Sequence, residues 1–349
     1  MKKPRIAVLF GGCSPEYGVS LASAYAVLTH MDPNRLVPVP VGISPTGDWF
    51  LYRGDVEKIP LDGWNNPEDC VPAALLPRRE APALLALGPD GGEPIPIDAA
   101  FPILHGKNGE DGTVQGLFEL MGVPVIGCGT LASALCMDKD RAHRLAFAAG
   151  VAIPASFAAD KNIGEAELLV RARGIGYPLF VKPVRAGSSF GITKVVDPHE
   201  LSAAVALALR YDDRAMVEEA IAGFEVGCAV MGNAELRVGE VDEIELSDGF
   251  FDFEEKYTLK TSAIHVPARI SAEKASEIKE TARLIYRTLG CAGFARVDMF
   301  LEPSGRIVFN EVNTIPGFTP HSRFPGMMKA AGMSFQEVVA RVIEWGAGK

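Results

Sequence analysis

Hydrophobic and polar positions alternate with two different periods along the chain, and each period predicts a different kind of element. An apolar run at Ile6–Phe10 predicts a buried strand, and a glycine turn follows it before a helix at Ser20–His30. A second short apolar run lies within residues 95–104. Because strand, turn and helix alternate here, we expect an N-terminal domain built on a parallel sheet, with the proline-rich residues 51–96 as irregular insertions.

Patterns in the rest of the chain predict helices and strands in a different order. A helix is expected at Lys139–Ala149, ended by Gly150, and another at 275–289, where apolar residues step by three and four. Strands are expected at Leu179–Lys182, Ile192–Val196, Met216–Glu218, Val226–Met231, Val297–Leu301 and Arg306–Glu311. From about residue 175 onward the pattern therefore predicts an α+β organisation with strands in hairpins.

Composition and charge exclude several classes of protein. The 349 residues are 48% apolar, which is too much for a disordered chain, and the length predicts two or three domains. A net charge of −10 argues against binding to nucleic acid. The 6 cysteines form no C-x-x-C pair, which is typical of free thiols in a reducing cytoplasm. The N-terminal apolar run is too short for a signal peptide, and no stretch is long and apolar enough to span a membrane.

A loop of small residues at 182–191 is the first candidate site. Lys182 closes a predicted strand, and the glycine and two serines of Gly187–Ser189 expose N–H and hydroxyl groups that suit a phosphate. An ordinary hairpin turn is the alternative. The same segment spells G-x-S-x-G around Ser189, the pattern of a serine-hydrolase nucleophile. That geometry needs a helix directly after the strand, whereas a strand pattern follows, so a hydrolase is the weaker hypothesis.

Acidic and amide side chains form the second candidate site. Asp298 lies in one predicted strand, and Glu311 and Asn313 close the next. Residues i and i+2 of a strand point to the same face, so pairing of the two strands across 303–305 would bring all three together. Hard oxygen donors beside a phosphate site favour Mg²⁺, with a polar strand edge as the alternative.

Two further glycine-rich loops follow apolar runs. One is 11–16, after the first strand, and the other is 105–112, which holds three glycines, two acids and a histidine. The first loop lacks the spacing of a dinucleotide fingerprint, and the sequence contains no Walker A motif. A Rossmann oxidoreductase and a P-loop NTPase are therefore not supported. The second loop is interpreted either as a functional turn or as a solvated surface turn.

Taken together, these segments resemble the D-alanine–D-alanine ligase family of ATP-grasp enzymes. The matching runs are GGCSPEYGVSL (11–21), HGKNGEDGTVQG (105–116), SALCMDK (133–139), KPVRAGSSFG (182–191), EKY (255–257), RVD (296–298), NEVNTIPG (310–317) and HSR (321–323). The resemblance implies an ATP-grasp fold of α/β and α+β class, with an N-terminal Rossmann-like domain at 1–125. It further implies a central subdomain at 126–225 and a C-terminal subdomain at 226–349.

The resemblance also implies an activity. ATP would phosphorylate a first D-alanine, and the amine of a second D-amino acid would attack the acylphosphate. The cofactors would be ATP and two Mg²⁺ ions, with Mn²⁺ as a substitute. The product would serve peptidoglycan synthesis, and the enzyme would be a cytoplasmic homodimer without nucleic-acid or membrane partners.

The matching positions carry roles that the resemblance implies. The residues implied for ATP are Lys139, Lys182, Ser189, Glu218 for the adenine, Glu225 for the ribose and Lys256 for the γ-phosphate. The metal ligands are Asp298, Glu311 and Asn313. The residues implied for catalysis are Glu16 for the first substrate's ammonium, Arg296 and the Gly317 N–H for the oxyanion, and Ser188 and Tyr257 for orientation. His105 would lie near the first substrate, and Ser322 would seat the second substrate's carboxylate. A lid from Leu246 to about Lys260 would exclude water.

One position departs from the common family pattern. Arg323 follows Ser322, where many D-alanine–D-alanine ligases carry an apolar residue, and its guanidinium could donate to a substrate hydroxyl. The stretch 239–328 also looks most like the D-alanine–D-serine ligases of vancomycin resistance. D-Serine is therefore the favoured second substrate. The alternative is that Arg323 is a neutral surface variation on a housekeeping D-alanine–D-alanine ligase.

Overall fold

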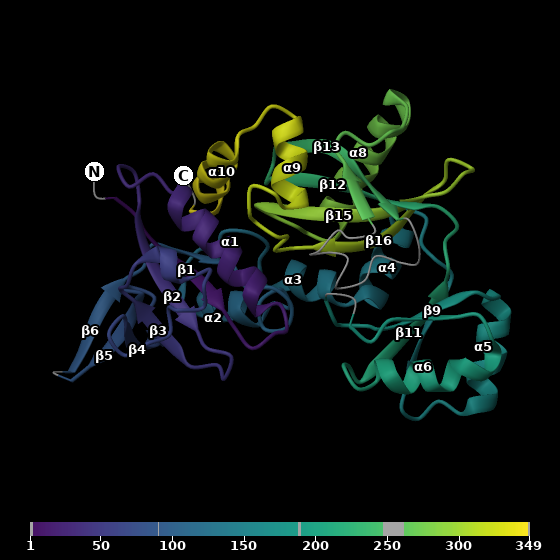
Figure 1. Cartoon of the computed structure of the whole chain (residues 1–349), viewed down its shortest axis with the longest axis horizontal. Coiled ribbons are helices and arrows are strands. Elements are labelled where there is room, and N and C mark those ends of the chain that lie inside the picture. The colour runs from purple at the N-terminus through teal and green to yellow at the C-terminus, as the bar shows by residue number, and fades with distance from the viewer. Residues whose placement is uncertain (1–2, 90, 188–189, 247–261, 348–349) are drawn as a thin grey trace.

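The computed structural model describes residues 3–89, 91–187, 190–246 and 262–347. The described chain folds around three sheets, of seven, four and five strands. Figure 1 shows the seven-stranded sheet at one end of the molecule and the other two sheets toward the opposite end, with helices α3 (Thr130–Met137) and α4 (Lys139–Ala148) between them. The domain boundaries expected from the sequence stay predictions.

The seven-stranded sheet is mixed rather than parallel. Only β1 (Arg5–Gly11) runs parallel to its neighbours, β2 (Val37–Ile43) and β7 (Ala99–Pro102). The remaining strands pair antiparallel and are β3 (Trp49–Tyr52), β4 (Cys70–Leu76), β5 (Ala83–Gly88) and β6 (Gly91–Pro96). The expectation that 51–96 is irregular was therefore wrong. Prolines 94 and 96 suggest a loop, but both lie in β6. This is an edge strand, where the missing N–H of a proline costs no hydrogen bond between strands.

Aromatic side chains hold one face of this sheet together. Trp64 is fully buried and packs edge-on against Phe10, with ring centroids 5.0 Å apart, and against Tyr52 at 6.2 Å. Its indole N–H donates to the Tyr17 hydroxyl at the start of α1 (Tyr17–His30). Gly42 lies directly beneath the ring, since a Cβ there would come within 2.1 Å of the indole. The other described elements of this region are the 3₁₀ turn Val56–Lys58 and α2 (Thr113–Met121).

The four-stranded sheet is antiparallel and presents two unlike faces. Its strands are β8 (Ser156–Asp160), β9 (Leu179–Pro183), β10 (Thr193–Val195) and β11 (Arg214–Glu219). Helices α5 (Glu165–Ile175) and α6 (Leu201–Ala208), the latter after a 3₁₀ turn at Pro198–Glu200, share a core with Val181 and Val217 on one face. Because side chains alternate along a strand, Lys182 and Glu218 lie on the opposite face.

The five-stranded sheet is also antiparallel, in the order β14-β13-β12-β15-β16. Its strands are β12 (Phe224–Gly232), β13 (Leu236–Leu246), β14 (Ser262–His265), β15 (Phe294–Leu301) and β16 (Ile307–Asn313). Helix α8 (Ala272–Thr288) shares a core with α3, α4 and one face of the sheet. Helices α9 (Arg323–Ala330) and α10 (Phe335–Gly346) pack on the other face. Among the described helices, none combines the length and apolar character that crossing a bilayer requires.

A shared core joins the first sheet to the third. Phe101 of β7 packs edge-on against Phe294 of β15, with centroids 5.9 Å apart, and against Phe318 at 6.0 Å. Phe318 stacks on Phe324 of α9 at 5.7 Å. Buried aromatic pairs add stability beyond the area they remove from water. This core therefore fixes the loops of the N-terminal sheet against the ends of β15 and β16.

We expect Gly42→Ala to destabilise the protein by about 1–3 kcal/mol, because the methyl group would overlap the buried Trp64 ring. Gly174→Ala is the matched control. Gly174 is an exposed residue of α5, and no heavy atom lies within 4 Å of the place its methyl group would take, so alanine should leave stability unchanged or raise it. Urea unfolding followed by circular dichroism measures both. Equal effects of the two substitutions would contradict the packing argument.

Candidate active site

Lys182 and Glu218 form a buried ion pair on the open face of the four-stranded sheet. Met216 is the register partner of Lys182, so Glu218 stands diagonally across from the lysine, and the Nζ–Oε1 distance is 2.6 Å. Lys182 Nζ also donates to the Asn310 side chain at 3.4 Å. Glu218 Oε2 is buried and has no hydrogen-bond partner within the described residues. A buried acceptor left open in this way suits a ligand donor such as the amino group of adenine.

Lys139 lies at the start of α4 and connects two of the candidate segments. Its Nζ donates to the Ala186 carbonyl at 2.8 Å and pairs with Glu311 at 3.2 Å. Asp138 caps the helix by accepting from the Arg141 N–H. Lys139 is thus held beside both the glycine–serine loop and the acidic cluster.

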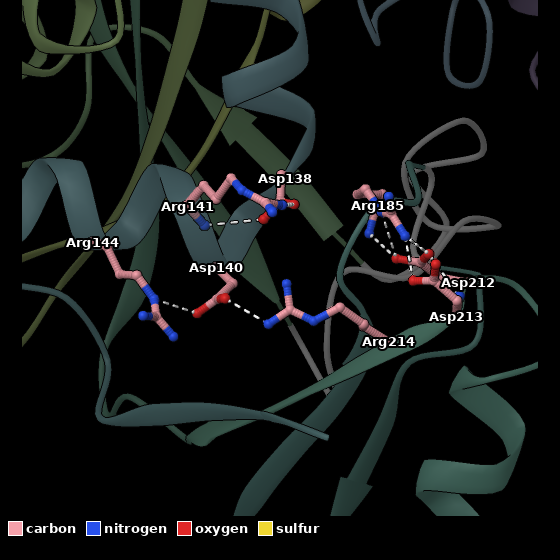
Figure 2. Close-up of polar contacts among 8 residues, drawn as sticks. All are labelled: Asp138, Asp140, Arg141, Arg144, Arg185, Asp212, Asp213 and Arg214. Carbon is pink, nitrogen blue, oxygen red and sulfur yellow. Dashed lines mark hydrogen bonds and ion pairs between the residues drawn. The ribbon is translucent and has the colours of Figure 1, made fainter. Parts of the chain in front are cut away.

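Ion pairs around α4 fasten the four-stranded sheet to this region (Figure 2). Asp140 accepts from Arg144 on its own helix at 2.9 Å and from Arg214 of β11 at 2.8 Å. Arg185, in the turn after β9, donates to Asp212 at 2.7 Å and also pairs with Asp213. The base of the loop that follows Lys182 is therefore tied to the start of β11.

The acidic side chains converge as the sequence predicts. Strands β15 and β16 pair with Asp298 opposite Glu311 and Arg296 opposite Asn313, so all four side chains lie on one face. Arg296 donates to both Asp298 oxygens at 2.6–3.0 Å. Burial raises the pKa of Asp298, but Arg296 and Arg323 outweigh it and hold that pKa below its ordinary value.

This donor set fits a divalent cation. The Asn313 Nδ2 donates to Asp298 at 2.9 Å, which leaves the amide oxygen as the atom available to a metal. Two carboxylates and an amide oxygen beside two lysines are the ligands expected around Mg²⁺ bound to a nucleotide phosphate. The oxygen atoms of these residues therefore fit Mg²⁺, and the two lysines fit a phosphate. Their roles as ligands remain predictions.

The loop 105–112 packs against Glu16 and the 313–317 segment. His105 is buried, its Nδ1 lies 2.8 Å from the Ile315 carbonyl, and burial lowers its pKa. Glu16 lies within reach of two candidate loops, because Cβ atoms on Gly106 and Gly187 would come within 2.6 and 2.9 Å of its Oε2. The surface-turn interpretation of 105–112 was therefore wrong for the buried residues His105, Gly106, Gly109 and Glu110, whereas Lys107 and Asn108 are exposed.

Gly317 and Ser322 lie together at the start of α9. A Cβ on Gly317 would lie 3.0 Å from Ser322 Oγ. The same hydroxyl accepts from the Thr319 N–H at 3.1 Å. The Phe318 N–H donates to Ser23 Oγ of α1 at 3.1 Å. The proposed oxyanion and second-substrate groups are thus adjacent, and α1 holds the segment between them.

Arg323 lies in the interior and joins three carboxylates. Its Nε and Nη2 donate to Asp242 at 2.7 and 2.9 Å, and its Nη1 donates to Glu225 at 2.9 Å. Nη2 is 3.4 Å from Asp298. The Arg323 side chain is only 8% exposed, and Asp242 is 0% exposed. Arg323 is therefore not a surface residue, and its effect on the choice of substrate stays a prediction.

Sequence reasoning missed two residues that complete this cluster. Asp242 of β13 is the register partner of Gly227 and accepts from its N–H at 2.8 Å. Gly227 provides the space for the guanidinium, since a Cβ would lie 2.5 Å from Arg323 Nη2. Asp242 stands between Val241 and Glu243, and nothing in this acidic stretch marks it as a buried residue. Ser188, Ser189, Lys256, Tyr257 and residues 247–260 of the predicted lid lie outside the described residues.

Comparisons with known proteins agree along the whole chain. Residues 5–128 match the family model described as D-ala D-ala ligase N-terminus, and residues 156–344 match D-ala D-ala ligase C-terminus. The chain belongs to the D-alanine–D-alanine ligase family. The ligase is 45% identical to vancomycin C-type resistance protein VanC1 of Enterococcus gallinarum, over 98% of each chain. It is 40% identical to a D-alanine–D-alanine ligase of Caldicellulosiruptor bescii, over 98% of this chain and 95% of the relative.

The fold of the ligase matches a solved structure of the same family. The VanG D-Ala:D-Ser ligase of Enterococcus faecalis superposes with a TM-score of 0.92 at 53% identity, covering 99% of both chains. The family carries out ATP-dependent ligation in peptidoglycan precursor synthesis, and its members include vancomycin resistance proteins. The ATP-grasp fold expected from the sequence is confirmed. A strand, β10, and not a helix follows residue 191, so the serine-hydrolase hypothesis was wrong.

We expect Arg323→Met to destabilise the ligase by about 3–5 kcal/mol, because it removes the cation that pairs with the fully buried Asp242. Arg341→Met is the matched control. Arg341 pairs with Glu344 on the surface, where such a pair contributes less than about 1 kcal/mol. Urea denaturation at neutral pH compares the two. A loss for Arg323→Met no larger than the control's would contradict the buried-network interpretation.

Proposed function

We propose that the ligase joins D-alanine to D-serine at the expense of ATP, by way of a D-alanyl phosphate. The choice of D-serine is argued from Arg323, which directly follows Ser322 in the sequence and forms a buried pair with Asp242. The solved D-Ala:D-Ser ligase at 53% identity supports the same choice. Housekeeping synthesis of D-alanyl-D-alanine is the alternative, because a D-alanine–D-alanine ligase is also 40% identical.

Binding of the nucleotide would use the lysines and acids of the two ATP-grasp sheets. Lys139 and Lys182 would contact phosphate oxygens, and the open Glu218 oxygen would accept from the adenine amino group. Glu225 would hold the ribose. Asp298, Glu311 and Asn313 would hold Mg²⁺, which neutralises charge on the transferring phosphoryl group. Because phosphoryl transfer depends on positioning and electrostatics, these residues need no proton-transfer role.

Dipeptide formation would follow in the space between the N-terminal loops and the start of α9. Glu16 would hold the ammonium of the first D-alanine, with the neutral His105 beside it. The amine of the second substrate would attack the acyl carbon, and phosphate would leave. Arg296 and the Gly317 N–H would stabilise the oxyanion of the tetrahedral intermediate. Ser322 would bind the second carboxylate.

Arg323 has donor capacity for a substrate hydroxyl. A guanidinium carries five N–H groups. Asp242 and Glu225 accept three hydrogen bonds from it, and Asp298 lies 3.4 Å from its Nη2. A site that bonds a hydroxyl discriminates strongly against a substrate that lacks one. D-Serine differs from D-alanine by that hydroxyl.

We further propose that the enzyme works in the cytoplasm, where ATP is available, and as a homodimer.

The purified ligase should release ADP and phosphate in the presence of ATP, Mg²⁺ and D-alanine, and removal of Mg²⁺ by a chelator should stop the reaction. With equal D-alanine and D-serine, we expect D-alanyl-D-serine to be the main product by mass spectrometry across pH 6–9. Absence of D-alanine-dependent phosphate release would overturn the ligase function. Predominant D-alanyl-D-alanine would support the housekeeping alternative.

Arg323→Met should shift the product ratio toward D-alanyl-D-alanine by at least ten-fold, since the hydroxyl loses its donor. The ratio is measured within one sample, so a smaller folded fraction does not affect it. Arg341→Met serves again as the control and should keep the wild-type ratio. An unchanged ratio in Arg323→Met would remove this residue from the specificity argument.

A further inference from the structure

Glu110 is a buried carboxyl group that bridges two distant parts of the chain. Its Oε2 accepts from the Gly106 N–H at 2.9 Å, within its own turn. Its Oε1 accepts from the Ile315 N–H at 2.9 Å, although Ile315 lies 205 residues further along the chain. The residue is buried, with 9% of its surface exposed to solvent. The carboxyl group thus joins the N-terminal loop to the segment that follows β16.

The same turn also binds the other polar atom of Ile315. His105 Nδ1 lies 2.8 Å from the Ile315 carbonyl, so both backbone groups of this residue bond to the 105–110 turn. Ile315 stands between Asn313, a candidate metal ligand, and Gly317, whose N–H is assigned to the oxyanion. A residue held at both its N–H and its carbonyl has little rotational freedom. The turn therefore determines where the 313–317 segment lies.

At its other end, the turn is bound to the residues around Glu16. The His105 carbonyl accepts from Ser14 Oγ at 2.7 Å, and that hydroxyl accepts from the Glu16 N–H at 3.1 Å. The Glu16 carboxylate packs against Gly106, where no side chain fits. A continuous chain of contacts thus runs from Glu16 through the turn and Glu110 to Ile315.

We propose that Glu110 is a positioning residue, which fixes the distance between the site of the first substrate at Glu16 and the oxyanion N–H at Gly317. It acts through Gly106 and Ile315 and contacts no reacting atom. The inference rests on the ligase function proposed above. Its chemical consequence is that the acylphosphate formed from the first substrate lies within reach of the oxyanion donor when the second amine attacks.

A carboxyl group in the surroundings of Glu110 costs more free energy than an apolar side chain in the same place would. Burial and the neighbouring Glu16 raise its pKa to about 8, with Glu311 adding to the effect. It lines a small cavity together with Lys139, Glu311 and Asn313. An apolar side chain would fill such a position without these costs. The two backbone bonds are what a carboxyl group supplies here and an apolar residue does not.

Glu110→Gln, assayed at about pH 9 where the carboxyl group is largely ionised, provides the direct test, because it keeps the size of the side chain but turns one acceptor into a donor that faces a backbone N–H. When the oxyanion donor is misplaced, water competes with the second amine. Water then attacks the acyl carbon, the bond to the phosphate oxygen breaks, and D-alanine is regenerated with inorganic phosphate. We expect at least three ADP per dipeptide in Glu110→Gln, against about one in the wild type, and a KM for ATP within two-fold of wild type.

The ratio of ADP to dipeptide separates positioning from stability, since a smaller folded fraction lowers both products equally. Asp111→Asn is the matched control: Asp111 accepts from Asn108 and Thr113 inside the same turn and should keep the wild-type ratio. A wild-type ratio in Glu110→Gln would overturn the inference. If that variant does not fold, Glu110→Asp, too short to reach both N–H groups, must show the raised ratio instead. No ADP release by the wild type with D-alanine would defeat the ligase function itself.

Discussion

Charge placed out of contact with water has to be neutralised where it stands, and this requirement organises the active site. The proposed reaction would need cations for phosphates and carboxylates for metal, and the fold holds such side chains on buried sheet faces. Each is therefore paired within the protein: Lys182 with Glu218, Arg296 with Asp298, and Arg323 with Asp242. The pairs hold the side chains in place, and under the proposed function the ligands would exchange partners with groups already oriented.

The two-residue period of β-strands places these groups together. Along β15, Val297 and Met299 face the core under α8, so Arg296 and Asp298 face the opposite side. The neighbouring strands add their own alternate residues at the same level, which turns one face of the sheet into a row of charges. The N-terminal domain contributes through loops instead, and the aromatic core around Phe101 and Phe318 determines how those loops meet the sheet.

Local pattern was sufficient for much of this arrangement. The strands that hold Lys182 and Asp298 and the hairpin that joins Asp298 to Asn313 follow from apolar alternation and turn residues. Strands β4 to β6 were not predicted, because the prolines and glycines within them resemble loop sequence and only the neighbouring strands give them order. Asp242 was missed for a related reason. Its partner Arg323 is 81 residues away, and no local signal records which buried charges will meet.

The space left by Gly227 limits which amino-acid substitutions the enzyme can accept around Arg323. Arg323 occupies the volume that any larger residue at 227 would need, and Asp242 is buried only because the guanidinium neutralises it. Replacing Gly227 leaves a clash, and replacing Arg323 leaves Asp242 without its cation. A change of substrate choice through Arg323 would therefore cost stability, which a substitution elsewhere in the protein would have to restore.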